Sequence, residues 1–292
     1  MLLIYVNCRP LLPNYLVNDD FINAAFVRKI KNSKLIFNDQ RFHKVSKYRQ
    51  RRGSVSALDS DKWPNGRIPY ILSNAYTPKQ RAVLALAITA YNTKTCIRFV
   101  PKTSSDVDYI EIAKIDGCFA DFSKVGGRQQ VSLVDECIEY PTIIHEFMHV
   151  IGFIHEHQRE DRDGFVRILW DNVINGANAD FEKLSSMGLS NYGERYDYFS
   201  IMHYESTEGS KNGRPTIIAN IPEYSSLMGK SMDFTQGDLN RINRAYKCYN
   251  YIKINNEQQQ KKVEEEQTSM FTHFWNKQQQ QQHYYLKTQK YN

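Results

Sequence analysis

The segment HEFMHVIGFIHEH, residues 145–157, contains four of the eight histidines of this 292-residue chain. On a helix, side chains four positions apart lie on one face a single turn apart, so His145 and His149 can bind the same metal ion. Gly152 can end the helix in a left-handed conformation and turn the chain, which brings His155 back as a third ligand. The segment therefore predicts one metal ion bound by three imidazoles, with a coordination position left open.

The specificity of this signal comes from the glycine and the third histidine. By itself, H-E-x-x-H is expected by chance in roughly one chain of this length per hundred, and the extended pattern in about one per 10⁵. An open fourth position is typical of a catalytic rather than a structural zinc site. Glu146 lies beside the first histidine, within reach of that position, and we expect it to act as a general base.

A second motif, SIMHY at residues 200–204, lies downstream. Taken alone, Met202 is more simply interpreted as a core methionine. Together with the histidine helix it completes the metzincin pattern, in which a Met-turn lies beneath the zinc ligands.

Other segments predict a domain of strands and helices. A turn at residues 63–66 leads into an apolar strand at 68–72. Alternating apolar residues predict further strands at 96–100, 108–115 and 129–134.

Two further helices have clear start signals. Thr77 is an expected N-cap with Gln80 in the capping-box position, and Thr235 with Asp238 repeats the arrangement in a helix that runs to Cys248. The motif helix should span about residues 142–151. The apolar face of the first helix comprises Val83, Leu84, Ala87, Ile88 and Tyr91.

The first 52 residues differ from the rest of the chain in charge. They contain 11 Lys/Arg and 3 Asp/Glu, a balance of +8, so the remaining residues carry −2 of the total of +6. This distribution argues against nucleic-acid binding, which uses a basic surface on the folded domain. The run R-Q-R-R that ends at Arg52 fits a processing site, and an ordinary solvated charge run is the alternative.

The two ends of the chain carry weaker signals. The first residues, MLLIYVNC, match a signal peptide poorly, because their apolar run precedes the first basic residue. No apolar stretch of roughly 18 residues predicts a membrane span. The polar, Gln-rich residues 250–292 predict a disordered tail.

Five cysteines bear on the redox compartment. Four of them form an even set in the body of the chain: Cys96, Cys118, Cys137 and Cys248. The fifth, Cys8, lies within the first 52 residues. The even set favours two disulfides and an oxidising compartment. Buried free thiols are the alternative.

The motifs HEFMHVIGFIHEHQREDRD and SIMHY resemble those of the astacin family of zinc endopeptidases, which are metzincins. WPNGRIPY, KTCIRFVP and QQVSL resemble the family as well, and the likeness covers roughly residues 54–248. It implies an α+β fold, the two-subdomain zincin fold of metzincins. In that fold, a twisted, mostly parallel sheet has an edge strand, and the active-site helix lies above the sheet. An irregular C-terminal subdomain follows and ends in a final helix.

The resemblance also implies a division of the chain and a function. Residues 1–52 would be a leader or propeptide, 53–249 the catalytic domain and 250–292 the tail, a short nematode-like form without EGF or CUB modules. The expected function is that of a secreted zinc-dependent endopeptidase, which hydrolyses internal peptide bonds of proteins and is activated from a zymogen by removal of the propeptide. One Zn²⁺ per chain, protein or peptide substrates and an activating protease are implied, with no nucleic acid.

Several site residues are assigned by this resemblance alone. Tyr204 is an additional zinc ligand at rest and later stabilises the oxyanion, and Glu156 contacts the new N-terminus after activation. The residues of a buried ionic support for the ligand loop are Arg159, Asp161, Arg162 and Asp163. We expect His157 to lie on the surface and His203 to be structural, because neither is a ligand in the family.

The resemblance also pairs Cys96 with Cys248 and Cys118 with Cys137. In the leader, the sequence IFND that ends at Asp39 resembles the family pattern F-x-G-D, whose aspartate occupies the zinc position of the zymogen. Removal of the leader would release this ligand.

The edge strand corresponds to residues 118–122, beside which a substrate peptide would lie extended. Asp121 replaces a common aromatic residue and Ser123 a common glycine, which leaves the subsite preference open.

Three alternatives stand beside this interpretation: an inactive astacin-like domain that binds a partner, another metzincin such as a matrixin, and a zinc site that only stabilises the fold. Retention of Glu146, the three histidines and Tyr204 weighs against the first. Glu156 directly after the third histidine favours astacin over a matrixin. No cysteine lies close to the motif to close a structural site.

Overall fold

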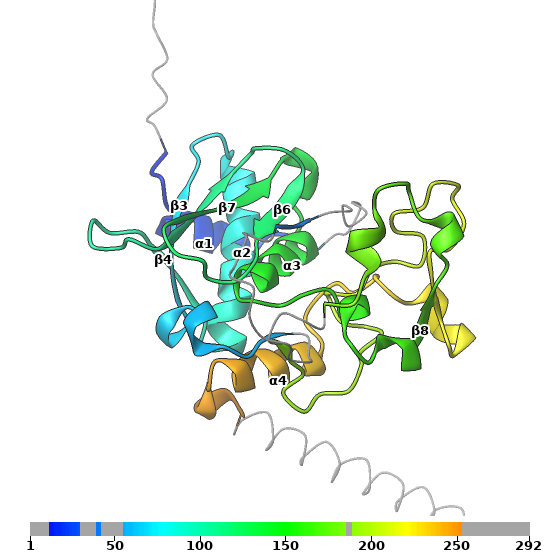
Figure 1. Ribbon diagram of the computed structural model, residues 1–292. Coiled ribbons are helices and arrows are strands. Elements are labelled where there is room, and N and C mark those ends of the chain that lie inside the picture. The colour runs from blue at the N-terminus through cyan, green and yellow to red at the C-terminus, as the bar shows by residue number, and fades with distance from the viewer. Residues whose placement is uncertain (1–11, 30–38, 42–54, 185–188, 253–292) are drawn as a thin grey trace, which may run out of the picture. The chain divides into compact units, whose positions relative to one another are not determined.

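The computed structural model describes residues 12–29, 39–41, 55–184 and 189–252 (Figure 1). The chain divides into one compact unit over residues 1–248 and a second over 249–292. The predictions for Cys8, for the run that ends at Arg52 and for the Gln-rich tail beyond residue 252 lie outside the described residues. Within them, no helix is both long and apolar enough to cross a bilayer.

A six-stranded sheet in the order β1-β6-β7-β5-β3-β4 forms the larger part of the first unit. Its strands are β1 (Gln40–Arg41), β3 (Arg67–Leu72), β4 (Arg98–Pro101), β5 (Tyr109–Ala113), β6 (Cys118–Asp121) and β7 (Arg128–Leu133). Every neighbouring pair is parallel except β6 with β7. The mostly parallel sheet predicted from the sequence is therefore confirmed, and β1 of the leader pairs with the predicted edge strand.

Helix α2 (Pro78–Lys94) begins where the capping signals predict. The backbone N–H of Gln80 donates to Thr77 Oγ1 at 3.3 Å, and the N–H of Thr77 donates to Gln80 Oε1 at 3.0 Å. All five residues of the predicted apolar face are buried, and the Tyr91 hydroxyl donates to the carbonyl of Ile144 at 2.7 Å.

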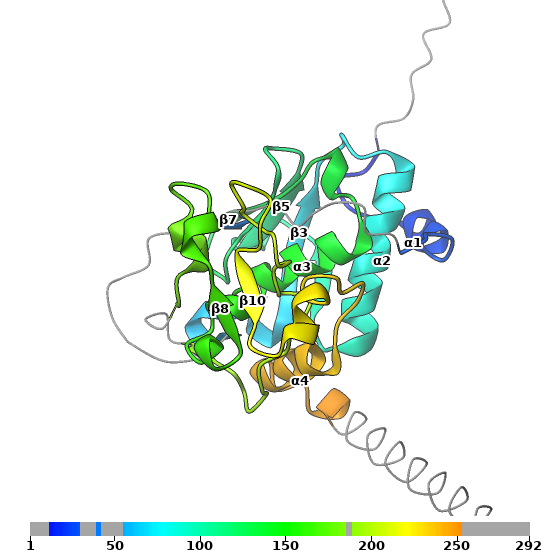
Figure 2. The same cartoon turned by 90° about the vertical axis from the view of Figure 1, so that its right-hand side faces the viewer.

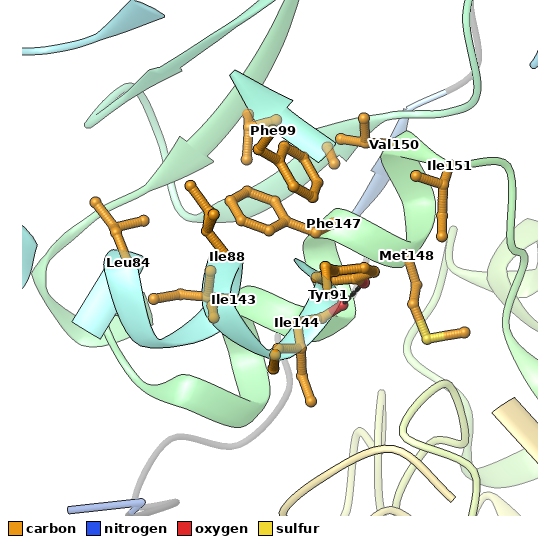
Figure 3. Packing of buried hydrophobic residues seen from close by; sticks show 14 of the residues in the cluster. Leu84, Ile88, Tyr91, Phe99, Ile143, Ile144, Phe147, Met148, Val150 and Ile151 are labelled. Atoms are coloured by element: carbon orange, nitrogen blue, oxygen red, sulfur yellow. Dashed lines mark hydrogen bonds between the residues drawn. The ribbon is translucent and has the colours of Figure 1, made fainter. Parts of the chain in front are cut away.

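Helix α3 (Tyr140–Val150) carries the histidine motif and packs against α2 and the sheet (Figure 3). It starts at Tyr140, before the predicted residue 142, because Pro141 suits the first turn of a helix. All of its residues are buried. The rings of Phe99 from β4 and Phe147 from α3 stack with centroids 4.4 Å apart, so the motif helix is held rigidly between two layers of the core.

Gly152 turns the chain directly after α3, as the sequence predicts. Its φ is +92°, a left-handed conformation that side chains other than glycine rarely adopt. A Cβ atom there would lie 3.3 Å from Ser123 Oγ and from Ser56 Cβ, so the turn is also closely packed.

The second part of the unit is mostly irregular and has its own hydrophobic cluster. Its short strands β8 (Val166–Ile168) and β10 (Ile217–Ala219) are antiparallel, and β2 (Val55–Ser56) pairs antiparallel with β9 (Leu189–Ser190). This separate core confirms the predicted two-subdomain fold (Figure 2).

The remaining helical segments are short. The α-helices are α1 (Asn18–Ala24) in the leader and α4 (Gln236–Ala245), which Thr235 and Asp238 cap as predicted and which ends before Cys248. The 3₁₀ turns are η1 (Asp59–Asp61), η2 (Pro64–Gly66), η3 (Asp135–Cys137), η4 (Glu156–Gln158), η5 (Arg162–Gly164), η6 (Trp170–Asn172), η7 (Asn178–Phe181) and η8 (Pro222–Ser226).

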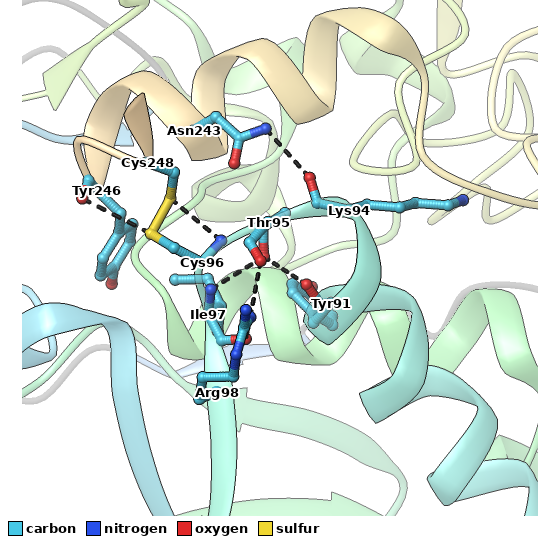
Figure 4. Close-up of a disulfide and its surroundings, with 9 residues drawn as sticks. All are labelled: Tyr91, Lys94, Thr95, Cys96, Ile97, Arg98, Asn243, Tyr246 and Cys248. Carbon is cyan, nitrogen blue, oxygen red and sulfur yellow. Dashed lines mark hydrogen bonds between the residues drawn. A yellow bond between two sulfur atoms is a disulfide. The ribbon is translucent and has the colours of Figure 1, made fainter. Parts of the chain in front are cut away.

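Two disulfides join Cys96 to Cys248 and Cys118 to Cys137, the pairing that the resemblance implies. The first links the chain just after α2 to the chain just after α4 (Figure 4). Strand β4 starts at Arg98, two residues after the predicted start at Cys96. The two bridges span 152 and 19 positions of the sequence.

Removal of each disulfide should destabilise the domain, and the loss should grow with the logarithm of the length of the loop that the bridge closes. By the chain-entropy relation, Cys96→Ala with Cys248→Ala should cost about 5 kcal/mol of unfolding free energy, and Cys118→Ala with Cys137→Ala about 3 kcal/mol. Denaturant titrations of the two double variants, followed by intrinsic fluorescence, measure both losses. A larger loss for the shorter loop would contradict this account.

Candidate metal centre

The three histidines of the motif and Asp39 of the leader meet at one buried point. One ligand atom from each of the four side chains lies within 4.8 Å of all the others. His145 and His149 come from successive turns of α3, and His155 follows the Gly152 turn. The bend that the sequence predicts therefore brings the third imidazole to the other two.

The second nitrogen of each ring is held by an oxygen acceptor. The contacts are His145 Nδ1 to Ile201 O (2.7 Å), His149 Nδ1 to Phe153 O (2.7 Å) and His155 Nδ1 to Gln158 Oε1 (3.2 Å). A carbonyl oxygen can only accept, so each Nδ1 carries the proton and each Nε2 presents its lone pair. The rings are oriented as neutral metal ligands.

These lone pairs face a carboxylate. Asp39 Oδ2 lies 3.1 Å from His145 Nε2, and Asp39 Oδ1 lies 2.9 Å from His155 Nε2 and 3.8 Å from His149 Nε2. Among the described residues, Asp39 Oδ1, His149 Nε2 and His155 Nε2 have no hydrogen-bond partner. Buried acceptors directed at one another are costly unless a cation lies between them. Three nitrogens and a carboxylate oxygen fit the ligand preference of Zn²⁺.

Glu146 has the environment expected of a general base. Its side chain is fully buried, and neither carboxylate oxygen has a hydrogen-bond partner among the residues that the structure describes. Burial raises the pKa of Glu146 well above its ordinary value, and the charge of Asp39 raises it further. A buried carboxyl group without a partner is rare unless a ligand or reaction uses it.

The SIMHY segment lies beneath the histidines. Met202 is 1% exposed and belongs to the core of the sheet subdomain, and its carbonyl accepts from the backbone N–H of Glu156 at 2.9 Å. Two residues later, Tyr204 belongs to the core of the second subdomain, and its ring centroid lies 4.4 Å from that of His155. The metal cluster therefore lies where the two cores meet.

The expectation that His157 lies on the surface is wrong. Its side chain is fully buried, its ring lies 4.3 Å from that of Tyr204, and its Nε2 contacts the carbonyl of Asp180 at 2.9 Å. The chain after His155 turns inward as η4, which places this histidine between the ligand loop and the second core. Burial lowers its pKa well below the usual value.

His203 lies in a structural position. It is fully buried, with Nε2 2.7 Å from the Tyr196 hydroxyl and Nδ1 2.8 Å from the carbonyl of Tyr204.

Glu156 is the centre of a buried ion network that sequence reasoning missed in part. Its carboxylate accepts from Arg159 at 2.8 Å, from the backbone N–H of Asp197 at 2.9 Å and from Arg241, which belongs to α4. Although burial raises the pKa of Glu156, Arg241 and Arg159 hold it below the usual value. The expected new N-terminus, Gly53, lies outside the described residues.

The ionic support predicted after His155 is only half correct. Arg159 and Arg162 are buried, whereas the side chains of Asp161 and Asp163 are 45% and 62% exposed. The guanidinium of Arg162 reaches inward to the carbonyl oxygens of His157 (2.9 Å) and Phe181 (2.7 Å). The carboxylates of Asp161 and Asp163 thus pair with these arginines at the surface, where they keep their hydration.

The two substitutions in the edge strand have defined structural roles. Asp121 is buried, and its Oδ2 accepts from the backbone N–H of Gln130 at 2.7 Å. The side chain therefore stabilises the contact between β6 and β7. Ser123 has a φ of +62°, the conformation that a glycine adopts easily. Its N–H donates to the carbonyl of His149 at 2.9 Å, which ties the end of this strand to the ligand helix.

Replacement of Glu156 should destabilise the domain strongly. Glu156→Gln should cost about 3–5 kcal/mol of unfolding free energy, because it removes the buried counter-charge that Arg159 and Arg241 share and leaves each with one carboxylate. Asp161→Asn is the matched control: it removes a carboxylate from the same Arg159 but at an exposed position, and should cost under about 1 kcal/mol. Denaturant titration compares the two, and equal losses would contradict the assignment.

Comparison with known proteins agrees with this geometry. Residues 56–247 match the family model of astacin, a peptidase family. The zinc metalloproteinase nas-8 of Steinernema carpocapsae is 49% identical over 198 residues, which are 68% of this chain and 47% of that protein. Zinc metalloproteinase nas-8 of Caenorhabditis elegans is 47% identical over 205 residues, 70% of this chain and 50% of that protein. The chain thus spans about half the length of these relatives.

A solved structure supports the same relationship. High choriolytic enzyme 1, a hatching enzyme zinc-protease of the medaka fish Oryzias latipes, aligns with a TM-score of 0.61 and 35% identity. The alignment covers 67% of this chain and all of that one. Since the family model spans well over half of the sequence and the motif histidines meet at one point, this chain belongs to the astacin family.

Proposed function

We propose that this protein is a zinc-dependent endopeptidase that hydrolyses internal peptide bonds of proteins or peptides. His145, His149 and His155 would hold one zinc ion. The observation that carries the proposal is the convergence of three imidazole lone pairs, together with the buried carboxylate of Glu146, which has no hydrogen-bond partner among the described residues. Bound zinc supplies Lewis acidity, which polarises the scissile carbonyl and lowers the pKa of water toward 7.

The protein's own residues would carry the proton transfers and position the substrate. Glu146 would take a proton from the attacking water and deliver it to the nitrogen of the leaving amine. Tyr204, beside His155, would donate its hydroxyl hydrogen to the developing oxyanion. Strand β6 would pair with the extended substrate, because its outer edge is the one that β1 of the leader occupies in this structure.

We also propose that the described form is latent and that Asp39 blocks the site. Its carboxylate lies among the three imidazoles, and its carbonyl accepts from the N–H of Ala120 in β6 at 2.9 Å. One short segment of the leader thus occupies both the metal position and the substrate edge. Cutting after Arg52 by an activating protease would free both, and Glu156 would then contact the new N-terminus.

Secretion is part of the proposal. Two disulfides form in the described part of the chain, and such bridges persist in oxidising compartments.

Removal of the proposed base should abolish turnover but not metal binding. In the processed protein, Glu146→Ala should retain one zinc per chain and lower kcat/KM for a peptide substrate by about 10²–10⁴-fold, the usual contribution of a general base. Glu136→Ala, at an exposed glutamate ten positions earlier, is the control and should match the parent protein. Zinc is measured by atomic absorption, and unchanged turnover in Glu146→Ala would reject the role.

Removal of the leader carboxylate should weaken latency without any cut. In a chain made resistant to processing by Arg52→Ala, the added change Asp39→Ala should produce measurable, chelator-sensitive cleavage of a short peptide, because the fourth metal position is then open. Asp19→Ala, at an exposed position of the leader, should leave the chain without measurable peptide cleavage. Equal activity of the two variants would contradict the inhibitory role of Asp39.

A further inference from the structure

The leader attaches to the body of the protein at a second place, on helix α2. In both Figures 1 and 2, α2 lies between α1 of the leader and the motif helix α3. Helix α1 therefore contacts the domain on the side of α2 that faces away from α3. This attachment plays no part in blocking the metal position, and its chemistry needs a separate explanation.

Arg81 is the centre of this second attachment. It lies in the first turns of α2, at the edge of the apolar face of that helix, and its side chain is fully buried. Its Nη2 donates to Asp20 Oδ2 at 2.8 Å, and its Nε lies 3.1 Å from both oxygens of the same carboxylate. Its remaining bonds go to the carbonyl oxygens of Pro13 (3.0 Å) and Tyr15 (2.5 Å). Among the described residues, every hydrogen bond of this side chain ends on the leader.

The backbone of the leader completes the attachment. The N–H of Leu72, in β3, donates to the carbonyl of Asn14 at 2.7 Å, and the hydroxyl of Tyr70 accepts from the N–H of Leu16 at 3.0 Å. The side chain of Leu16 is 5% exposed and belongs to the core of the sheet subdomain. The segment is therefore bound by polar and apolar contacts together, as a ligand is bound in a preformed site.

We propose that Arg81, with Tyr70 and Leu72, forms a binding site for leader residues 13–20 and retains the leader on the protein after the chain is cut at Arg52. The inference rests on the proposed latency. A cut after residue 52 leaves Asp20 and Asp39 on the same fragment, so the fragment stays attached at two points. Each attachment raises the effective concentration of the other.

This site determines how the leader leaves. Dissociation from α2 must break the buried ion pair between Arg81 and Asp20, and the hydrogen bonds of Arg81 to Pro13 and Tyr15, before water can solvate the guanidinium. Cutting at Arg52 is thus one step, and release of residues 13–20 is a second step that limits opening of the metal site. The contacts define the chemistry of the peptide that this site binds. It offers the carboxylate of Asp20 and the backbone carbonyl oxygens of Pro13 and Tyr15 to Arg81.

The test uses the full-length chain with residues 47–52 replaced by Glu-Asn-Leu-Tyr-Phe-Gln, after which a site-specific viral protease cuts before Gly53. After complete cutting, size-exclusion chromatography at successive times measures how much leader fragment still elutes with the body. The parent fragment should co-elute, and Asp20→Asn should speed its loss at least about tenfold, since a buried ion pair is broken. Asp19→Asn, one position earlier and exposed, is the matched control and should behave as the parent.

Two results would overturn the proposal: immediate loss of the parent fragment on cutting, or equal rates for Asp20→Asn and Asp19→Asn. The melting temperature of each uncut variant shows that it is folded. Arg81→Lys provides a second variant on the body side and should also speed release, because one ammonium group cannot hold the carboxylate and both carbonyls. Retention is read from the column, so a lack of peptidase activity would contradict the proposed function but leave this test valid.

Discussion

The site depends on one constraint: three imidazole rings must direct their lone pairs at the same point. The protein meets it by binding the Nδ1 atom of each ring to an oxygen. For His145 and His149 these acceptors are backbone carbonyls, of Ile201 and Phe153. The orientation of the rings therefore depends on the path of the chain more than on neighbouring side chains. The left-handed turn at Gly152 places the second of these carbonyls, and the Met-turn places the first.

The helix α4 is hydrogen-bonded to the Met-turn through the side chain of Asp238. Asp238, whose side chain belongs to the capping box of α4, accepts from the hydroxyl of Ser200 at 2.6 Å and from the N–H of Ile201 at 3.1 Å. The carbonyl of the same Ile201 holds His145. Arg241, one turn along α4, pairs with Glu156, and the Cys96–Cys248 disulfide fastens the chain just beyond this helix. A helix far from the motif in sequence thus fixes the ligand geometry.

Helix α2 packs into the core on one face and contacts α1 on another. Its predicted apolar face packs into the core with α3, which keeps the ligand helix in place. Arg81 lies at the edge of that face. It is buried because leader residues cover it and bring a carboxylate with them.

Local features of the sequence were sufficient for much of the fold. Capping residues located α2 and α4, and a single glycine indicated the bend after α3, because these signals act within one turn of a helix. The sequence was less informative at η4. There the chain turned His157 inward, while Asp161 and Asp163 stayed exposed, because burial depends on which distant segment covers a residue.

The sequence by itself determined the metal ligands and their spacing, because His145, His149 and His155 are joined by one helix and one turn. The resemblance of IFND to a family pattern indicated Asp39 as well. Only the tertiary structure decided two supporting contacts: the carbonyl of Ile201 on His145, and the pairing of Glu156 with Arg241. Those contacts join segments separated by tens of residues. No local pattern encodes them, since they arise only when the core packs the segments together.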